Sequence, residues 1–182
     1  MKIESITNDG RLWSIKYDAE ERNALESLFE KWGNPQWLME FFEKNISDLS
    51  AYFKITDLNQ AIFDTLEDNK QLQCLILDIS PDADLDKLFR PLENNRIQEM
   101  SLAREKAKIQ KRPSHASWLR IYAIRLEPGI YIVTGGAIKL TATMQEREHT
   151  IQELSNMEKV RTFLLSESIY DAEGLADYLD QL

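Results

Sequence analysis

The sequence predicts an α+β fold in which helices cover one side of a small, mainly antiparallel sheet. Apolar residues recur at helical spacings of three and four over much of the first 80 residues and again after residue 143, whereas residues 114–140 are rich in β-branched and aromatic residues. Helical and strand-like segments therefore cluster separately along the chain, which is typical of the α+β class. The 182 residues, 43% of them hydrophobic, are expected to form a single domain.

The first predicted strand covers residues 11–17, which alternate between two faces. Its buried, aromatic face is predicted to consist of Trp13, Ile15 and Tyr17. Asp18 is the predicted N-cap of the first helix, and Gly33 is expected to end it because glycine is favoured just beyond the last helical residue. The predicted inner stripe of this helix is Leu25, Leu28, Phe29 and Trp32.

Asn34-Pro35 is expected to open the next segment, since proline is tolerated at the first helical position, and a short second helix is predicted from Gln36 to Lys44. Its predicted inward residues are Trp37, Leu38 and Phe41. Ser47 is expected to cap a short helix that ends at Phe53, and a long helix is predicted over residues 57–79. The alternative for residues 72–79 is a strand, because Cys74 lies in a short apolar run, but the absence of Gly and Pro favours a helix. A buried, structural thiol is predicted for this lone cysteine.

Residues 81–117 are predicted to form an irregular crossing segment, and the core of the sheet is expected in residues 118–165. Two strands over residues 118–126 and 130–134 are joined by the turn Glu127-Pro128-Gly129, and a third strand follows Gly135-Gly136, which together predict an antiparallel meander. A capping-box pattern over residues 143–146 predicts the next helix, with the apolar stripe Ile151, Leu154, Met157, Val160 and Phe163. Asp171 is the predicted cap of a C-terminal helix within residues 166–182.

The charge is distributed unevenly along the chain. The formal net charge is −9, yet residues 104–139 carry eight basic and two acidic residues, so the rest of the chain carries −15. This balance argues against a general nucleic-acid binder and confines any site for a polyanion to the basic window. No stretch approaches 18 consecutive apolar residues and no apolar targeting region begins the chain, so we expect a cytoplasmic protein without a membrane partner. No cofactor is expected either, because a Gly-rich phosphate loop and a Cys/His zinc pattern are both missing.

Cations and aromatic residues gather on the predicted meander. The set consists of His115, Arg120, Tyr122, Arg125, Tyr131 and Lys139. Strand alternation places Trp118, Arg120 and Tyr122 on one face and Arg125 on the other. An arginine between two aromatic rings can hold a phosphate while the rings stack on bases, which predicts an RNA site. The alternative is that both arginines are rim residues paired with the chain's many acids.

Three short strings in this part of the chain carry a resemblance to a known family. They are LFRPLENN at 88–95, WLRIYAIRL at 118–126 and YIVTGGAIKLT at 131–141. In these strings, in the order of its elements and in the charged helix that follows, the chain resembles the RelE/ParE superfamily of toxins, and more narrowly its phage-derived HigB-like branch. The likeness covers residues 85–165, and the N-terminal half by element order alone. It implies a RelE-like fold with a first strand, helices, further strands and a terminal helix.

The resemblance also implies a function. Such a protein would be the toxin of a type II toxin-antitoxin system, cleaving mRNA on the ribosome and neutralised by a cognate antitoxin, often a helix-turn-helix protein. Cleavage by a ribose 2′-hydroxyl needs a base, an acid and a cation for the developing charge. Arg120 matches the strand arginine of the family, with Arg125 as a second candidate, and Lys139 matches the lysine that ends the third core strand. Tyr131 or His115 would serve as acid or base. The further RNA-binding candidates are Trp118, Tyr122, Lys111 and Arg112.

The chain also departs from the family pattern. Family members are usually small and basic, whereas this chain is acidic, nearly twice as long and carries extra helices between residues 35 and 79. An acidic surface is repelled by ribosomal RNA outside the basic window. The rival hypothesis is therefore a catalytically inactive RelE-like protein that acts as a protein-binding module or regulator and whose acidic half binds a basic partner.

Overall fold

The computed structural model describes residues 1–77, 84–92, 102–108 and 116–181. Within these residues the chain forms seven α-helices and a six-stranded mixed sheet, so the predicted α+β class is confirmed. The elements in chain order are β1 (Lys2–Ser5), β2 (Leu12–Lys16), α1 (Ala24–Trp32), α2 (Pro35–Lys44), α3 (Ile46–Asp48), the π-helical turn η1 (Leu49–Phe53), α4 (Leu58–Leu77), α5 (Leu85–Leu88), β3 (Phe89–Pro91), β4 (Ala103–Ala107), β5 (Leu119–Glu127), β6 (Ile130–Ile138), the 3-10 turn η2 (Met144–Glu146), α6 (Glu148–Ser166) and α7 (Ala172–Asp180).

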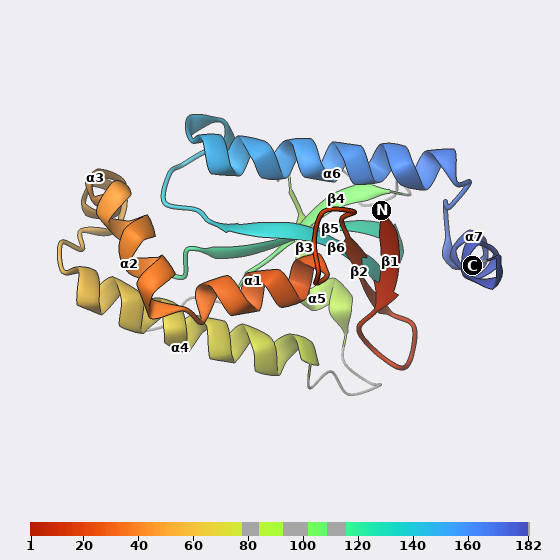
Figure 1. Cartoon of the computed structure of the whole chain (residues 1–182), viewed down its shortest axis with the longest axis horizontal. Helices are drawn as coiled ribbons and strands as arrows, with labels where there is room; N and C mark the ends of the chain where they lie inside the picture. Colours follow the sequence, from red (N-terminus) through yellow and green to blue (C-terminus); the bar gives the residue numbers. More distant parts are fainter. Residues whose placement is uncertain (78–83, 93–101, 109–115, 182) are drawn as a thin grey trace.

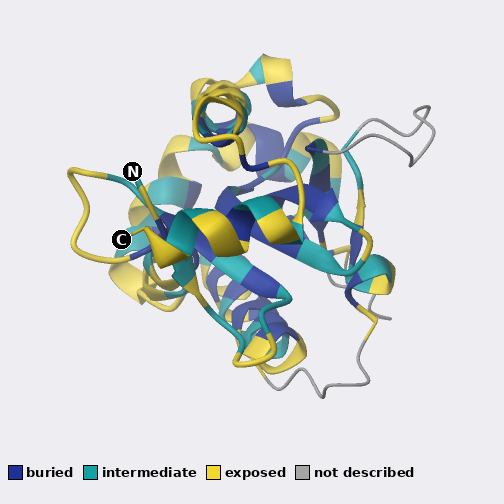
Figure 2. Cartoon of the chain, turned by 90° about the vertical axis from the view of Figure 1, so that its right-hand side faces the viewer, coloured by how far each residue is buried: buried dark blue, intermediate teal, exposed yellow. Residues whose placement is uncertain are grey.

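The sheet lies between two layers of helices. Its strand order is β1-β2-β6-β5-β4-β3, and every neighbouring pair is antiparallel except β2 and β6. Helix α6 covers one face, and α1 and α4 lie on the other (Figure 1). Figure 2 shows buried residues concentrated on the strands and on the sides of the helices that face them. The expectation that helices cover only one side of the sheet was therefore wrong.

The predicted meander is replaced by a hairpin. The turn at Gly129, which has a φ of 81°, joins β5 to β6 as expected. Gly135 and Gly136 do not form a second turn, because they lie inside β6 with extended backbone. The antiparallel partner on the other side of β5 is β4. A Cβ at Gly136 would lie 2.5 Å from the Arg120 carbonyl oxygen, so this glycine permits close packing instead of reversing the chain.

The N-terminal prediction needs two corrections. Strand β1 pairs with β2 and was not predicted. In β2, Leu12, Ser14 and Ile15 are buried while Trp13 is only half-buried, because both faces of the sheet are covered. Helix α1 begins after Asn23, whose side chain accepts a hydrogen bond from the Glu26 N–H at 3.1 Å. Asp18 instead accepts a hydrogen bond from the N-terminal ammonium group at 2.6 Å.

The helical predictions are largely confirmed. Asn34 caps α2, and Pro35 is its first residue. Helix α4 extends to Leu77, so the strand alternative fails over residues 72–77, and residues 78–79 lie outside the described residues. Cys74 is exposed, because it lies on the side of α4 opposite the buried Leu72 and Ile76. The prediction of a buried thiol was therefore wrong.

The crossing segment contains structure that the sequence did not predict. Residues 84–92 and 102–107 form α5, β3 and β4, which are too short to show a clear period. The capping box at Thr143 and Glu146 is present but starts η2, and Ile151 of the predicted stripe is exposed. Asp171 caps α7 as predicted, accepting a hydrogen bond from the Gly174 N–H at 2.9 Å. In the part of the chain that the structure describes, no helix is both long and apolar enough to cross a membrane.

Candidate functional site

A pocket of about 390 Å³ opens on the α6 side of the sheet. It lies among β4, β5, α6 and the segment that follows β6. Five of its described lining residues are basic and none is acidic. We call it the cationic pocket, and its basic residues are Arg104, Lys106, Lys108, Arg120 and Lys139. Such a concentration of positive charge in a concave site favours the binding of an anion.

Strand geometry brings these side chains together. Arg104 and Lys106 are two residues apart on β4 and so share a face. Lys106 is in register with Tyr122 on β5, and Arg120 lies two residues before this tyrosine. The Lys139 N–H donates to the Trp118 carbonyl oxygen at 2.8 Å, which holds the end of β6 beside the start of β5. The alternation of two neighbouring strands therefore builds one cationic face.

Backbone carbonyl groups orient three of the cations. Arg120 Nη1 donates to the Ser117 and Leu119 carbonyl oxygens at 2.8 and 2.7 Å. Lys139 Nζ donates to the carbonyl oxygens of residues 141 and 142 at 2.7 and 2.6 Å. Lys106 Nζ donates to the Leu92 carbonyl oxygen at 2.9 Å. These carbonyl groups carry no net charge, and they hold the three cations at the wall of the pocket.

The pKa values of the two half-buried lysines reflect this crowding. Burial, together with the nearby positive charges of Arg120 and Lys108, lowers the pKa of Lys106. Burial and the charges of Arg120 and Lys106 lower the pKa of Lys139 in the same way. Burial also lowers the pKa of Arg120. A bound anion would relieve this repulsion and favour the charged forms.

Tyr122 lines the cationic pocket but is fully buried. Its hydroxyl has no hydrogen-bond partner among the described residues. Burial raises the pKa of this hydroxyl, which therefore stays protonated at neutral pH. Because the ring is covered, a nucleotide base cannot stack on it as predicted.

Three other predicted site residues lie away from the cationic pocket. Trp118 is buried on the opposite side of the sheet, where its Nε1 donates to Thr65 Oγ1 at 2.9 Å; it precedes β5, so the strand alternation does not extend to it. Arg125 is also buried, with its Nε 4.0 Å from Glu105 Oε1. Tyr131 stacks on Phe89 with ring centroids 4.5 Å apart, and its hydroxyl donates to Asp86.

The remaining predicted residues, His115, Lys111 and Arg112, lie outside the described residues. Sequence reasoning missed Arg104, Lys106 and Lys108 as site residues. A basic residue at every second position from 104 to 108 indicates one face of a strand, and that signal would have found them.

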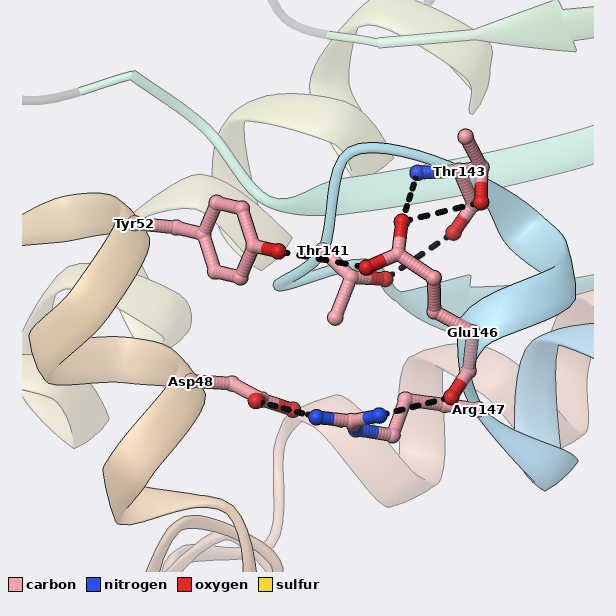
Figure 3. A network of polar contacts seen from close by, with 6 residues as sticks. All are labelled: Asp48, Tyr52, Thr141, Thr143, Glu146 and Arg147. Carbon is pink, nitrogen blue, oxygen red and sulfur yellow. Dashed lines mark hydrogen bonds and ion pairs between the residues drawn. The ribbon is translucent and has the colours of Figure 1, made fainter.

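A polar network supports one wall of the cationic pocket, formed by residues 142–145 (Figure 3). Glu146 accepts hydrogen bonds from the Thr143 N–H and hydroxyl at 2.5 and 2.9 Å, and from the Tyr52 hydroxyl at 3.1 Å. Arg147 Nε and Nη2 donate to both carboxylate oxygens of the buried Asp48 at 2.6 and 2.5 Å. The helical segment over residues 46–53 therefore contacts the chain that forms this wall.

No family model, no curated protein and no solved structure matches the chain. The functional proposal therefore depends on the chemistry of the cationic pocket and on the resemblance described above.

Proposed function

We propose that the cationic pocket binds the phosphate backbone of RNA and that the protein is a toxin-like, ribosome-dependent mRNA endonuclease of a type II toxin-antitoxin system. The observation that carries this proposal is the convergence of five basic side chains on one pocket whose described lining holds no acidic residue. Arg120 and Lys139, the two residues that match motif positions of the RelE/ParE superfamily, line this same pocket. The expected partner is a cognate antitoxin of the helix-turn-helix type.

Phosphate suits the pocket better than other anions. An arginine side chain presents paired N–H groups that match two phosphate oxygens, and lysines add compact charge. The volume of about 390 Å³ falls within the usual range for small-molecule sites, so the pocket has room for a nucleotide-sized group. A chain of nucleotides also explains why the basic residues extend along β4 and on to Lys108, just beyond its end.

The proposed reaction is an internal transesterification. The ribose 2′-oxygen attacks the adjacent phosphorus, the bond from phosphorus to the 5′-oxygen breaks, and the products are a 2′,3′-cyclic phosphate and a 5′-hydroxyl end. The 2′-hydroxyl proton passes to a base, and an acid protonates the leaving 5′-oxygen. Lys106 is the proposed base, because it lies in the cationic pocket beside Arg120, and burial and the nearby positive charges lower the pKa of its amine. Arg120 stabilises the charge that develops on the phosphate, and protonated Lys139 supplies the second proton.

These assignments differ from the roles implied by the resemblance. Tyr131 lies on the other face of the sheet with its hydroxyl bonded to Asp86, so the acid and base roles pass to the two lysines. His115 lies outside the described residues, and a role for it is a hypothesis from the resemblance alone.

Primer extension on total mRNA after brief induction tests the proposal. We expect new 5′ ends within minutes of wild-type expression, and at least about 100-fold less cleavage in Lys106→Ala, Arg120→Ala and Lys139→Ala, the range typical of lost acid-base or electrostatic catalysis. Lys87→Ala removes the same charge from an exposed position on α5 and should cleave like the wild type. Intact mRNA and normal growth after wild-type expression would defeat the nuclease hypothesis.

The second candidate is a catalytically inactive RelE-like protein that binds another protein. The net charge of −15 outside the basic window favours it, because that surface attracts a basic partner and repels ribosomal RNA. This candidate predicts that mRNA stays intact while a basic partner copurifies. The primer-extension experiment therefore separates the two candidates.

A further inference from the structure

Part of one edge of β6 has no strand partner among the residues that the structure describes. Strand β5 pairs with β6 from residue 130 to residue 138 except at Thr134, whereas β2 pairs only with residues 131–133. Tyr122 pairs with Gly135 and Ala123 pairs with Val133, so Thr134 is an extra, unpaired residue in β6. Beyond this bulge, the residues of β6 whose backbone groups point to β5 are the odd-numbered ones. Because the Lys139 N–H points to β5, the backbone groups of residues 134, 136 and 138 point to the open edge.

Side chains cover this open edge. The Tyr17 hydroxyl donates to the Thr134 carbonyl oxygen at 2.6 Å. His149 Nε2 lies 3.0 Å from the Ile138 carbonyl oxygen. Between them, the Glu153 carboxylate lies close enough to the Gly136 N–H for this group to lower its pKa. Glu153 therefore projects from α6 onto the backbone of β6.

A pocket of about 290 Å³ adjoins this edge, enclosed by α1, α2, β6 and α6. We call it the aromatic pocket, because its apolar walls include Trp32, Trp37 and Phe41. Trp37 and Phe41 are half-buried and stacked, with ring centroids 5.5 Å apart. The backbone of the glycine pair lines the pocket as well. A Cβ at Gly135 would collide with the Glu153 carboxylate, so this glycine makes room for the acid.

The Glu153 carboxylate lacks a complete set of donors. Its Oε2 is buried and has no hydrogen-bond partner among the described residues. Burial raises its pKa to about 7, although the charge of Lys31, the Gly136 N–H and the Asn156 side chain each act to lower it. Within the described chain no ion pair joins Glu153 to a cation. The other titratable groups that line the pocket or interact with Glu153 are Tyr17, Glu20, Arg22, Tyr122 and His149.

We propose that the aromatic pocket binds a guanidinium or alkylammonium cation, with Glu153 as its counter-ion and the stacked Trp37 and Phe41 rings against its apolar stem. A buried carboxylate oxygen without a donor is costly, and a cationic N–H group supplies both the hydrogen bond and the charge. Guanidinium groups also pack favourably against aromatic faces. The group is carried either by an arginine or lysine side chain of a polypeptide or by a small free cation.

This site is distinct from the cationic pocket and does not rest on nuclease activity. Among the residues that the structure describes, none lines both pockets. The two sites also differ in charge, because the cationic pocket is lined by five basic residues and no acid, whereas the aromatic pocket is lined by two acids, Glu20 and Glu153, and two cations, Arg22 and Lys31. A cation that binds at Glu153 should therefore be indifferent to the loss of Arg120.

Binding of a cation is coupled to the loss of a proton from Glu153. Because the pKa of this group is about 7, the ionised fraction rises from roughly one tenth at pH 6 to nine tenths at pH 8. The affinity for a cation should accordingly rise about tenfold over this range. A ligand held only by apolar contacts would show no such rise.

Isothermal titration calorimetry on the full chain tests the inference with three probes. The first is an N-acetylated, C-amidated Gly-Arg-Gly peptide, the second is the same peptide with neutral citrulline in place of arginine, and the third is agmatine. At pH 8 we expect binding of a guanidinium probe that is at least about tenfold tighter than that of the citrulline peptide. At pH 6, where Glu153 is mostly protonated before binding, the observed enthalpy should depend on the ionisation enthalpy of the buffer, because the buffer takes up the proton that Glu153 releases. Tighter binding of the arginine peptide assigns a polypeptide source, whereas tighter binding of agmatine assigns a small cation.

Variants complete the test. Glu153→Gln should weaken binding at least about tenfold and abolish its pH dependence, and Trp37→Ala should weaken binding at every pH. Glu158→Gln removes an exposed carboxylate from the same helix and should change neither property. Arg120→Ala should bind the guanidinium probe like the wild type, whatever its effect on RNA. Equal binding of the citrulline peptide, unchanged binding by Glu153→Gln, or no binding of any probe at millimolar concentration would overturn the inference.

Discussion

Arg120 and Arg125 lie five residues apart on β5, and their side chains project from opposite faces of the sheet. Arg120 lines the cationic pocket on the α6 side. Arg125 is only 7% exposed and lies beside the equally buried Glu105 on the other side. The odd spacing produces this difference, because successive residues of a strand alternate between faces. Only one of the two arginines is therefore placed to bind an anion from solution.

Substitution of the two arginines should separate RNA binding from stability. Arg120→Gln should remove about one phosphate contact, lowering the slope of log K against log salt for single-stranded RNA by about 0.7, with little change in the free energy of unfolding. Arg125→Gln should leave the RNA affinity unchanged and cost about 1–3 kcal/mol of stability, because Glu105 loses its counter-charge. Fluorescence anisotropy and urea unfolding measure the two effects. Weaker RNA binding by Arg125→Gln at unchanged stability would contradict this assignment.

The same comparison shows how much of the site could be predicted from the sequence. Alternation alone placed Arg120 and Tyr122 on one face and Arg125 on the other, and all three placements agree with the structure. Alternation could show that Arg104, Lys106 and Lys108 share a face, but not that this face adjoins Arg120, because that depends on the pairing of β4 with β5, which is a tertiary property. Alternation also could not show that Tyr122 is buried beneath α6, because the sequence predicted that this face of the sheet is open.

Short sequence patterns predicted the ends of helices better than they predicted which strands pair with each other. Gly33, Asn34 and Asp171 mark helix ends as predicted, because caps act within a few residues of the chain. Asp18 is not the cap, because α1 begins only after Asn23. Gly135-Gly136 was misread as a turn, since a glycine pair serves equally well where another group must approach a strand closely.

The buried carboxyls of Glu105 and Glu153 should make the protein less stable as the pH rises. Burial raises the pKa of each to about 7, whereas the ordinary value is 4.5. Between these values the folded state binds more protons than the unfolded state, so the free energy of unfolding falls as pH increases from about 5 and levels off above about 7. Each group should contribute about 1–3 kcal/mol to this fall.

Urea unfolding at pH 5, 6, 7 and 8 measures the effect. Glu105→Gln should flatten the profile partly, and the double variant Glu105→Gln with Glu153→Gln should flatten it almost completely. Glu158→Gln, on the exposed face of α6, is the matched control and should keep the wild-type profile. A stability that rises between pH 5 and pH 7 would show that these two carboxyls are not held protonated by burial.

Gly136→Ala should destabilise the protein more than Gly135→Ala does. A Cβ at Gly136 would meet the Arg120 backbone oxygen at 2.5 Å and Leu28 Cδ1 at 2.8 Å, and the backbone oxygen cannot move without disturbing β5. We expect a loss of about 2–3 kcal/mol in the free energy of unfolding. At Gly135 the obstacle is the flexible Glu153 side chain, which can rotate away. Thermal unfolding ranks the two variants, and the reverse order would show that β6 is free to shift away from β5.

The ion pair of Asp48 and Arg147 should couple the helical segment of residues 46–53 to the cationic pocket. Arg147→Ala leaves the buried Asp48 carboxylate without its two donors, so we expect a loss of about 1–3 kcal/mol in stability. It also loosens the wall formed by residues 142–145, so the RNA affinity should fall several-fold although Arg147 does not line the pocket. Lys70→Ala breaks an exposed pair with Glu67 on α4 and should cost less than about 0.5 kcal/mol with unchanged RNA affinity. Urea unfolding and anisotropy titrations on both variants measure these changes. An Arg147→Ala variant that loses stability but binds RNA like the wild type would show that the network supports the fold without shaping the pocket.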